Sequence, residues 1–200
     1  MKHANFQEKN LFMQIIGGIA SGIRLAVPKG LQVRPTLARS RKSLFDSMGS
    51  FAGLAVADFF AGTGAVGLEA ASRGASEVWF LESESKNCNI ITENIAKVAK
   101  AGADAEMKVL CSNVLHSYLR ISHADIVFAD PPYADSEEML KKLLSDAKFA
   151  EWAKDSLLIW ELPVSSRAEA INGILFENKA WMTLKKRKFG DSDFLFLKVS

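Results

Sequence analysis

Length, composition and charge describe a globular chain of ordinary size. It has 200 residues, of which 48% are hydrophobic, and a formal net charge of +2. This balance excludes a protein that attracts nucleic acid through its overall charge, and no apolar run reaches the length of a membrane span. One domain is expected over residues 13–200, behind a flexible N-terminal extension of residues 1–12.

The N-terminal segment carries a local excess of positive charge. Between Leu11 and Phe45 there is no Asp or Glu, whereas six basic residues occur there. Taking these six from the 25 Lys and Arg leaves 19 for the rest of the chain, against 23 Asp and Glu. A basic segment on a mildly acidic body indicates an anionic partner, although a solvated basic face would give the same pattern. The candidate contacts to such a partner are Arg24, Arg34, Arg39 and Arg41.

Residues 13–50 are predicted to form a small arm ahead of the core, which comprises residues 51–200. Two apolar runs, 14–18 and 23–27, are separated by a turn containing glycine and serine, and this pattern predicts a β-hairpin. Arg34-Pro35-Thr36 offers a helix start, and the apolar residues after it would give that helix one buried face. We expect the arm to pack beside the pocket of the core.

Strands and helices alternate from residue 54 onward. The predicted strands cover residues 54–58, 77–82, 107–111, 124–129 and 156–161. The helices between them cover about 65–73, 85–99, 113–119 and 136–149, and a short helix near 164–171 precedes an antiparallel hairpin of residues 181–188 and 194–199. The pattern predicts an α/β, Rossmann-like domain whose mostly parallel sheet has helices on both faces. Its antiparallel ending is more typical of methyltransferases than of dehydrogenases.

Three glycines follow the first predicted strand of the core. Gly62, Gly64 and Gly67 fit the spacing G-x-G-x-x-G, between an apolar run and a helix-forming stretch. Such a strand-to-helix turn lets a ligand approach the backbone, because glycine has no side chain to keep it away. Nucleotides, dinucleotides and S-adenosylmethionine all bind at such turns, and the spacing also occurs in purely structural ones. We interpret it as a cofactor loop.

Two acidic residues at strand ends favour S-adenosylmethionine among these cofactors. Asp58 lies four residues before Gly62, where a carboxylate can receive a cationic amino group. Glu82 closes the next strand, twenty residues after Gly62, at the spacing of an acid that binds ribose hydroxyls. NAD would satisfy Glu82 but would leave Asp58 unexplained. Asn113, after the third strand, would bind the adenine edge or cap the following helix, and both interpretations stay open.

The fourth strand is followed by Asp130-Pro131-Pro132-Tyr133, a composition suited to amine methylation. An exocyclic amine on a base is a poor nucleophile, because its lone pair is delocalised into the ring. The carboxylate of Asp130 and the carbonyl of Pro131 could accept both N–H bonds and favour a pyramidal nitrogen, ready for in-line displacement at a sulfonium methyl. Tyr133 could stack on the base. A plain proline turn is the alternative for this motif alone, but both motifs in this order, each after an apolar strand, favour the catalytic interpretation.

Cysteine and histidine offer no further chemistry. Cys88 and Cys111 have no Cys-x-x-Cys neighbour, and we expect both to be buried thiols. His3, His116 and His123 lack the spacing of metal ligands, so no metal site is predicted. The polar N-terminus is unlike a secretory signal, and a cytoplasmic location is expected.

These residues together resemble the RsmD family of bacterial methyltransferases, over about residues 14–199. The segments that carry the resemblance are Ile15-Ile16-Gly17-Gly18, Arg34-Pro35-Thr36 with Arg39, Arg41, Leu44 and Phe45, Asp58-x-Phe60-Ala61-Gly62-Thr63-Gly64-x-x-Gly67-x-Glu69-Ala70, Ser72-Arg73-Gly74-Ala75, Asp130-Pro131-Pro132-Tyr133 and Lys188-Phe189-Gly190-Asp191. The resemblance implies a seven-stranded Rossmann-like fold and S-adenosylmethionine as cofactor. It also implies that the N2 amine of a guanine in 16S ribosomal RNA is the methyl acceptor, within the small subunit or an assembly intermediate.

The resemblance further implies the roles of particular residues. The reaction site corresponds to Asp130, Pro131, Pro132 and Tyr133, and the cofactor-binding positions are Asp58, Phe60, Gly62, Gly64, Glu82, Asn113 and Asp130. The arginines of the arm would contact RNA, and a monomer without metal is expected. Similar proteins carry acids where this chain has Ala38 and Lys42, so the arm is more basic here and the choice of substrate is open.

Other functions are compatible with parts of the pattern. An adenine-N6 methyltransferase on DNA or RNA would use the same Asp-Pro-Pro-Tyr motif, although the chain leaves no room for a separate DNA-reading domain. A non-catalytic RNA-binding assembly factor could share the fold, but the intact Asp130 and glycines argue against it. A nicotinamide-dependent oxidoreductase fits least well.

Overall fold

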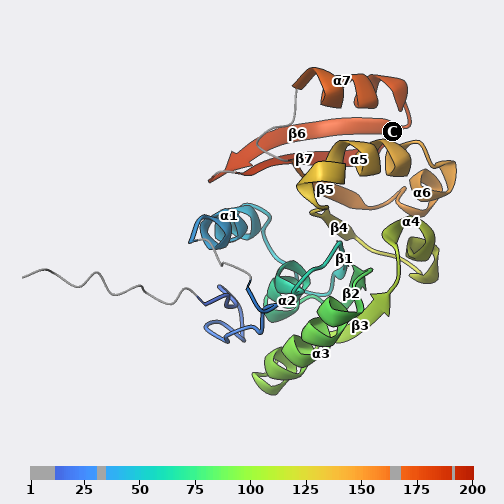
Figure 1. The fold of residues 1–200 in the computed structure, drawn as a ribbon. Coiled ribbons are helices and arrows are strands. Elements are labelled where there is room, and N and C mark those ends of the chain that lie inside the picture. Colours follow the sequence, from blue (N-terminus) through green and yellow to red (C-terminus); the bar gives the residue numbers. More distant parts are fainter. Residues whose placement is uncertain (1–11, 31–34, 163–167, 191) are drawn as a thin grey trace, which may run out of the picture.

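A computed structural model describes residues 12–30, 35–162, 168–190 and 192–200, and these form a seven-stranded sheet of order β3-β2-β1-β4-β5-β7-β6 (Figure 1). Its strands are β1 (Ala55–Phe59), β2 (Glu77–Glu82), β3 (Glu106–Cys111), β4 (Ile126–Ala129), β5 (Leu157–Leu162), β6 (Trp181–Phe189) and β7 (Ser192–Val199). The first five strands are parallel, and β7 is antiparallel to both β5 and β6. The predicted Rossmann-like sheet with a terminal antiparallel hairpin is therefore confirmed.

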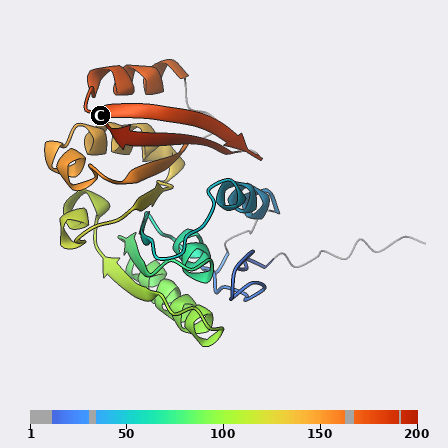
Figure 2. The same cartoon turned by 180° about the vertical axis from the view of Figure 1, so that it is seen from behind.

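Helices cover both faces of the sheet, as Figures 1 and 2 show from opposite sides. One face packs against α1 (Pro35–Asp46), α2 (Ala65–Ser72) and α3 (Ser85–Lys100). The other packs against α4 (Val114–Ser117), α5 (Ser136–Leu144), α6 (Ala147–Trp152) and α7 (Ala168–Glu177). In the central strands, alternate residues enter the two hydrophobic cores, so Phe128 lies in the first and Val127 in the second. The runs of apolar residues that predicted these strands are therefore explained by the burial of both faces of the sheet.

The central strands β1 and β4 determine where a ligand can bind. β1 pairs with β2 on one side and with β4 on the other. The helix that follows β1, α2, packs on one face, whereas α5, which follows β4, packs on the opposite face. This reversal leaves a crevice at the carboxyl ends of the two strands, and sheets of this class bind their ligands there.

Helix α1 lies across this region because its apolar residues have a partner on the sheet. Leu44 and Phe45 are buried, and the Phe45 ring centroid lies 5.3 Å from that of Phe128 and 5.0 Å from that of Phe51. Burial of such aromatic side chains is worth about 1.5–3 kcal/mol each relative to exposure. The helix of the arm is therefore fixed over the crevice, as the sequence predicted.

Before α1, the arm is less regular than predicted. An isolated antiparallel bridge joins Gln14 to Arg24, and backbone hydrogen bonds between residues 13–15 and 22–25 flank it. The predicted small hairpin is therefore present, although its two segments form no regular strands in the described part of the arm.

Two residues of α2, Glu69 and Ser72, also hold the segment. The Ser72 hydroxyl accepts a 2.9 Å hydrogen bond from the Ala20 amide and donates a 2.6 Å bond to the Gly17 carbonyl. The buried carboxylate of Glu69 accepts hydrogen bonds from the backbone amides of Ile16 and Gly17, each 2.8 Å long, and these amides can then no longer pair across a strand ladder.

Three predicted helix boundaries need correction. The helix expected at 136–149 is two helices, because Asp146 accepts a 2.9 Å hydrogen bond from the Lys148 amide and caps a new one. The helix expected at 113–119 ends at Ser117 and continues as a 3₁₀ turn, residues 118–120. Of the helix expected near 164–171, residues 163–167 lie outside the described residues, and α7 extends from Ala168 to Glu177. None of the helices in the described residues is long and apolar enough to span a membrane.

The two cysteines form a disulfide, and the prediction of free buried thiols is wrong. Cys88 lies in the first turn of α3 and Cys111 at the end of β3, with their Cα atoms 5.9 Å apart. Only Cys88 is buried. The pairing depends on how α3 packs beside β3, which residues 23 positions apart do not reveal in the sequence.

Candidate active site

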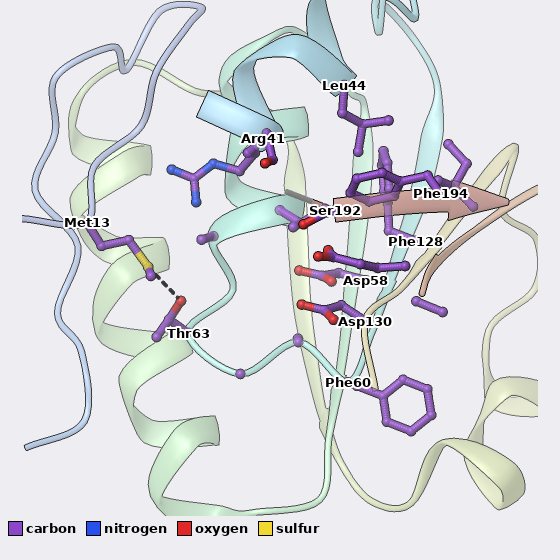
Figure 3. A pocket seen from close by; sticks show the side chains of 18 of the residues that line it. Met13, Arg41, Leu44, Asp58, Phe60, Thr63, Phe128, Asp130, Ser192 and Phe194 are labelled. Carbon is purple, nitrogen blue, oxygen red and sulfur yellow. Dashed lines mark hydrogen bonds between the residues drawn. The ribbon is translucent and has the colours of Figure 1, made fainter. Parts of the chain in front are cut away.

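A cavity of about 300 Å³ opens at the carboxyl ends of β1, β4 and β5, beneath α1. Figure 3 shows the carboxylates of Asp58 and Asp130 on the strand side of this cavity, with Arg41 entering it from α1. Four of the predicted cofactor-binding residues line it, namely Asp58, Phe60, Gly62 and Asp130. The volume is at the lower end of the range typical of small-molecule sites.

The glycine loop turns sharply between β1 and α2. Phe60, Gly62 and Gly64 have φ of 59°, 56° and 75°, so three positions of the loop adopt the left-handed conformation. Phe60 is the one non-glycine residue among those described with positive φ, and such strain concentrates at functional sites. Gly67 serves a different purpose, since a Cβ there would lie 2.5 Å from the Phe80 ring and 2.9 Å from Val78. It allows α2 to pack closely on β2, as the third glycine of this spacing does.

Asp58 is buried at the end of β1 and points toward α2. Its Oδ2 accepts a 2.8 Å hydrogen bond from the backbone amide of Gly67. Burial raises the pKa of Asp58 to about 7, and the nearby Glu82 carboxylate adds to the rise, whereas the Gly67 amide and Arg41 oppose it. The free site thus holds this carboxylate near its titration midpoint at neutral pH, and a cationic ligand would favour its ionised form.

Asp130 lies at the end of β4, adjacent to Asp58 at the end of β1. By surface area the residue is exposed, and its side chain lines the open cavity. Desolvation by the protein atoms around the carboxyl group raises the pKa of Asp130 well above its usual value, and the Glu161 and Asp58 carboxylates raise it further. Like charges held this close are typical of catalytic sites, where a ligand compensates the repulsion.

A third carboxylate, Glu161, lines the same cavity and was not predicted. It follows Trp160 in β5, and Trp160 is opposite Ala129 of β4 in the sheet register. Burial raises the pKa of Glu161, and a hydrogen bond with Ser192 opposes that rise. The signal was present in the sequence, since Asp58, Asp130 and Glu161 each end an apolar strand of the parallel sheet.

The other residues of the Asp-Pro-Pro-Tyr motif lead away from β4. Pro131 is buried and Pro132 is exposed. Tyr133 begins a 3₁₀ turn, Tyr133–Asp135, and its side chain lies outside the described part of the structure. The motif therefore places the Asp130 carboxylate in the cavity lining, and the roles of the Pro131 carbonyl and of Tyr133 stay predictions.

Glu82 and Asn113 organise the backbone near the cavity but do not line it. The Glu82 carboxylate accepts a 2.7 Å hydrogen bond from the Gly62 amide and a 2.8 Å bond from the Glu84 amide, and so fixes the glycine loop to the end of β2. The Asn113 side chain accepts a 2.9 Å hydrogen bond from the Leu115 amide, which confirms the N-cap interpretation. Their contacts to a cofactor, and that of Gly64, stay predictions.

Arg41 is the one cationic side chain among the described residues that line the cavity. Its side chain is 10% exposed and donates a 2.6 Å hydrogen bond to the Gln14 carbonyl, while its Nε lies 3.9 Å from Glu69 Oε2. Nε is buried and has no hydrogen-bond partner among the described residues. Burial lowers the pKa of Arg41, although the Glu69 and Asp58 carboxylates act in the opposite sense. A buried guanidinium with an unused donor can hold an anionic group of a ligand.

The four arginines proposed as RNA contacts occupy different environments. Arg24 and Arg39 are exposed, and the Arg24 guanidinium lies 3.9 Å from the centroid of the Phe12 ring. Arg41 belongs to the cavity rather than to the outer surface. Arg34 lies outside the described residues. In the described part of the chain, no cluster of His, Cys, Asp and Glu could hold a metal ion.

Comparison with known proteins places the chain in a family. Residues 13–198 match the family model described as Conserved hypothetical protein 95. The chain is 32% identical over 181 residues to ribosomal RNA small subunit methyltransferase D of Escherichia coli K12, an alignment that covers 89% of this chain and 85% of that protein.

Solved structures share the architecture. The structure of yhhF from Escherichia coli matches with a TM-score of 0.68 and 28% identity, over 94% of this chain and 98% of that one. A structure of the methyltransferase SMU.776, complexed with SAH, matches in fold with a TM-score of 0.63 at 15% identity, over 86% of this chain and 52% of that one. With a family model and a relative that each span most of its length, this chain belongs to the Conserved hypothetical protein 95 family, the RsmD family of methyltransferases.

Proposed function

We propose that this protein is an S-adenosylmethionine-dependent methyltransferase of ribosomal RNA, and that it methylates the exocyclic N2 amine of a guanine in 16S RNA. The observation that carries the proposal is the pair of carboxylates, Asp58 and Asp130, in one cavity beside the glycine loop. The 32% identity to a protein named for methylation of small-subunit ribosomal RNA supports the substrate class.

The charges of the cavity fit the proposed cofactor. S-adenosylmethionine supplies an electrophilic methyl group on a positively charged sulfonium, and it also carries an ammonium and a carboxylate. Asp58 and Asp130 would compensate the positive groups, whereas the Nε of Arg41, which donates no hydrogen bond within the described residues, suits the carboxylate. Glu82 retains lone pairs for ribose hydroxyls beyond the two amide bonds that it accepts.

At the reaction site, Asp130 would accept one N–H of the substrate amine and the carbonyl of Pro131 the other. Hydrogen bonds from both N–H groups to these acceptors would favour a pyramidal nitrogen. Its lone pair would then be less delocalised into the ring and would point into the cavity. The nitrogen would gain the methyl group while the electrons of the broken carbon–sulfur bond stay on sulfur, and it would lose one proton, which the Asp130 carboxylate can receive. Asp130 must therefore be ionised when the substrate binds, and the positive charge of the cofactor opposes the effects that raise its pKa.

The substrate would approach over the arm, where Arg24 and Arg39 are exposed. Phosphate contacts of this type position an RNA without reading its sequence. We take a small ribosomal subunit or one of its assembly intermediates, in the cytoplasm, to be the particle that presents the guanine. The name of the relative from Escherichia coli supports this class of particle.

The proposal is tested by methyl transfer from labelled S-adenosylmethionine to small-subunit particles from cells that lack this protein. Naked ribosomal RNA and DNA are assayed alongside, and the labelled nucleoside is identified by mass analysis. We expect label in N2-methylguanine. Label in N6-methyladenine would instead establish the adenine-N6 alternative, and no label despite measurable cofactor binding would favour a non-catalytic assembly role.

A further inference from the structure

The sheet register places Glu161 next to the proposed reaction site. Ala129 of β4 is opposite Trp160 of β5, so Asp130 and Glu161 follow at the ends of neighbouring parallel strands, which lie about 4.8 Å apart. Both side chains line the cavity, on the face where Phe128 and Ile159 enter the first core. Two acceptors therefore face the same space from adjacent strands.

The surroundings of Glu161 hold its carboxyl group in a defined position. Phe194 of β7 is opposite Glu161 in the sheet and also lines the cavity, and Ser192 forms a hydrogen bond with the Glu161 carboxylate. No cation contributes to its titration among the described residues. The third carboxylate of the cavity thus adds negative charge that the proposed roles of Asp58 and Asp130 do not use. Glu161 is half-buried, and its carboxylate has lone pairs beyond the one that Ser192 uses, so a ligand donor in the cavity would find an acceptor there.

The Watson–Crick edge of guanine supplies such a donor. Guanine carries the N2 amine and, directly beside it, the N1–H group, so two donors point the same way. Adenine offers its N6 amine beside N1, which is an acceptor with a lone pair. Two neighbouring carboxylates match the guanine edge, whereas with adenine one carboxylate would face the N1 lone pair. A site with an unpaired buried acceptor rejects an analogue that lacks the corresponding donor.

We propose that Glu161 accepts a hydrogen bond from N1–H of the target guanine while Asp130 accepts one from its N2 amine. This inference rests on the proposed function and names the group that selects guanine over adenine. Glu161 contacts the substrate base and not the cofactor, so its removal affects transfer and base discrimination while cofactor affinity is retained.

The test compares guanine with 2-aminopurine at the methylated position. 2-Aminopurine keeps the N2 amine but has a lone pair at N1 in place of N1–H. The guanine is first located with the wild-type protein, and 2-aminopurine is then introduced there by splinted ligation into the 16S RNA of reconstituted small-subunit particles. We expect the wild type to methylate guanine about 100-fold more efficiently than 2-aminopurine, as measured by kcat/KM. In Glu161→Gln the amide can donate to N1, and we expect this ratio to fall by about tenfold or more.

The outcomes separate this inference from the proposed function. If the wild-type product is N2-methylguanine but the guanine preference is unchanged in Glu161→Gln, the role of Glu161 is overturned and the function stands. If the wild type forms N6-methyladenine, both are overturned. Cofactor affinity by calorimetry is measured for each variant, and its loss in a folded Glu161→Gln protein would assign Glu161 to the cofactor instead. Should that variant fail to fold, Glu161→Ala is put through the same comparison, and an unchanged preference there overturns the inference.

Discussion

Asp58 Oδ2 accepts a 2.8 Å hydrogen bond from the backbone amide of Gly67, nine residues later in the chain. The bond joins the end of β1 to the first turns of α2 and holds the glycine loop between them. It also keeps a buried carboxylate facing the cavity, where its pKa is raised to about 7. The carboxylate that holds the glycine loop is thus also the group whose ionisation a bound cation would favour.

We predict that S-adenosylmethionine binds more tightly as pH rises from 5.5 to 7. The folded protein holds a proton on Asp58 up to about pH 7, because burial raises its pKa, and a cationic cofactor must displace this proton. Below the raised pKa, the affinity should change by up to about tenfold per pH unit for one such group. Calorimetry in two buffers with different ionisation enthalpies measures the proton release directly. Asp58→Asn should reduce the release, and an equal release in the variant and the wild type would contradict the assignment.

Arg41→Met should lower the affinity for S-adenosylmethionine by about 10- to 100-fold, which is the effect expected from losing a hydrogen bond to a charged group. The reason is that the buried Nε of Arg41 donates no hydrogen bond within the described residues, and that Arg41 is proposed to bind the cofactor carboxylate. Decarboxylated S-adenosylmethionine lacks that group, so the substitution should change its affinity much less. The exposed Arg39→Met serves as the matched control, and an equal loss for both cofactors would show that Arg41 acts only through the structure of the arm.

Arg39→Ala should reduce RNA binding and lower the slope of log affinity against log salt by about one unit, because each phosphate contact releases counterions. Lys154→Ala is the matched control, since this exposed lysine precedes the amino end of β5, whereas the cavity lies at the carboxyl ends of the strands. Binding to small-subunit RNA is measured by filter retention from 50 to 300 mM salt. If the two variants have the same slope, the RNA surface lies elsewhere.

Gly67→Ala should destabilise the protein by about 1–3 kcal/mol, because the new methyl group would overpack against the Phe80 ring and Val78. Gly173→Ala in α7 is a matched helix position, where a Cβ meets nothing within 4 Å. There the same substitution should stabilise by about 0.5–1 kcal/mol. Urea unfolding of both variants measures the difference, and equal effects would refute the close-packing role of Gly67.

The sequence was informative where the physical signal is local or periodic. Apolar runs predicted the strands because both faces of the sheet are covered, and the glycine spacing predicted the loop after β1. Asp58 and Asp130 were predicted because each accompanies a motif, the glycine spacing for Asp58 and Asp-Pro-Pro-Tyr for Asp130, and both line the cavity. Glu161 also lies near the carboxyl end of a parallel strand and lines the cavity, but no motif surrounds it.

What the sequence did not reveal depends on contacts between distant segments. Glu69 holds the amides of Ile16 and Gly17, 53 and 52 residues away, and this limits the strand pairing within the predicted hairpin. The position of Arg41 inside the cavity follows from how α1 docks on Phe128, whereas the sequence showed only its charge. The Cys88–Cys111 bond likewise arises from helix-to-strand packing.

The rate of methyl transfer by the Asp130→Asn variant tests the central claim most directly, because the Asp130 carboxylate is proposed to accept a hydrogen bond from the substrate amine. Methyl transfer to small-subunit particles is measured at saturating S-adenosylmethionine, with cofactor affinity determined on the same preparation. We expect the affinity to stay within about tenfold, since Asp58 and Arg41 would still hold the cofactor, while the transfer rate falls by about 10²–10³-fold. Near-normal turnover in a variant that binds cofactor would contradict the assignment of Asp130 as the catalytic acceptor.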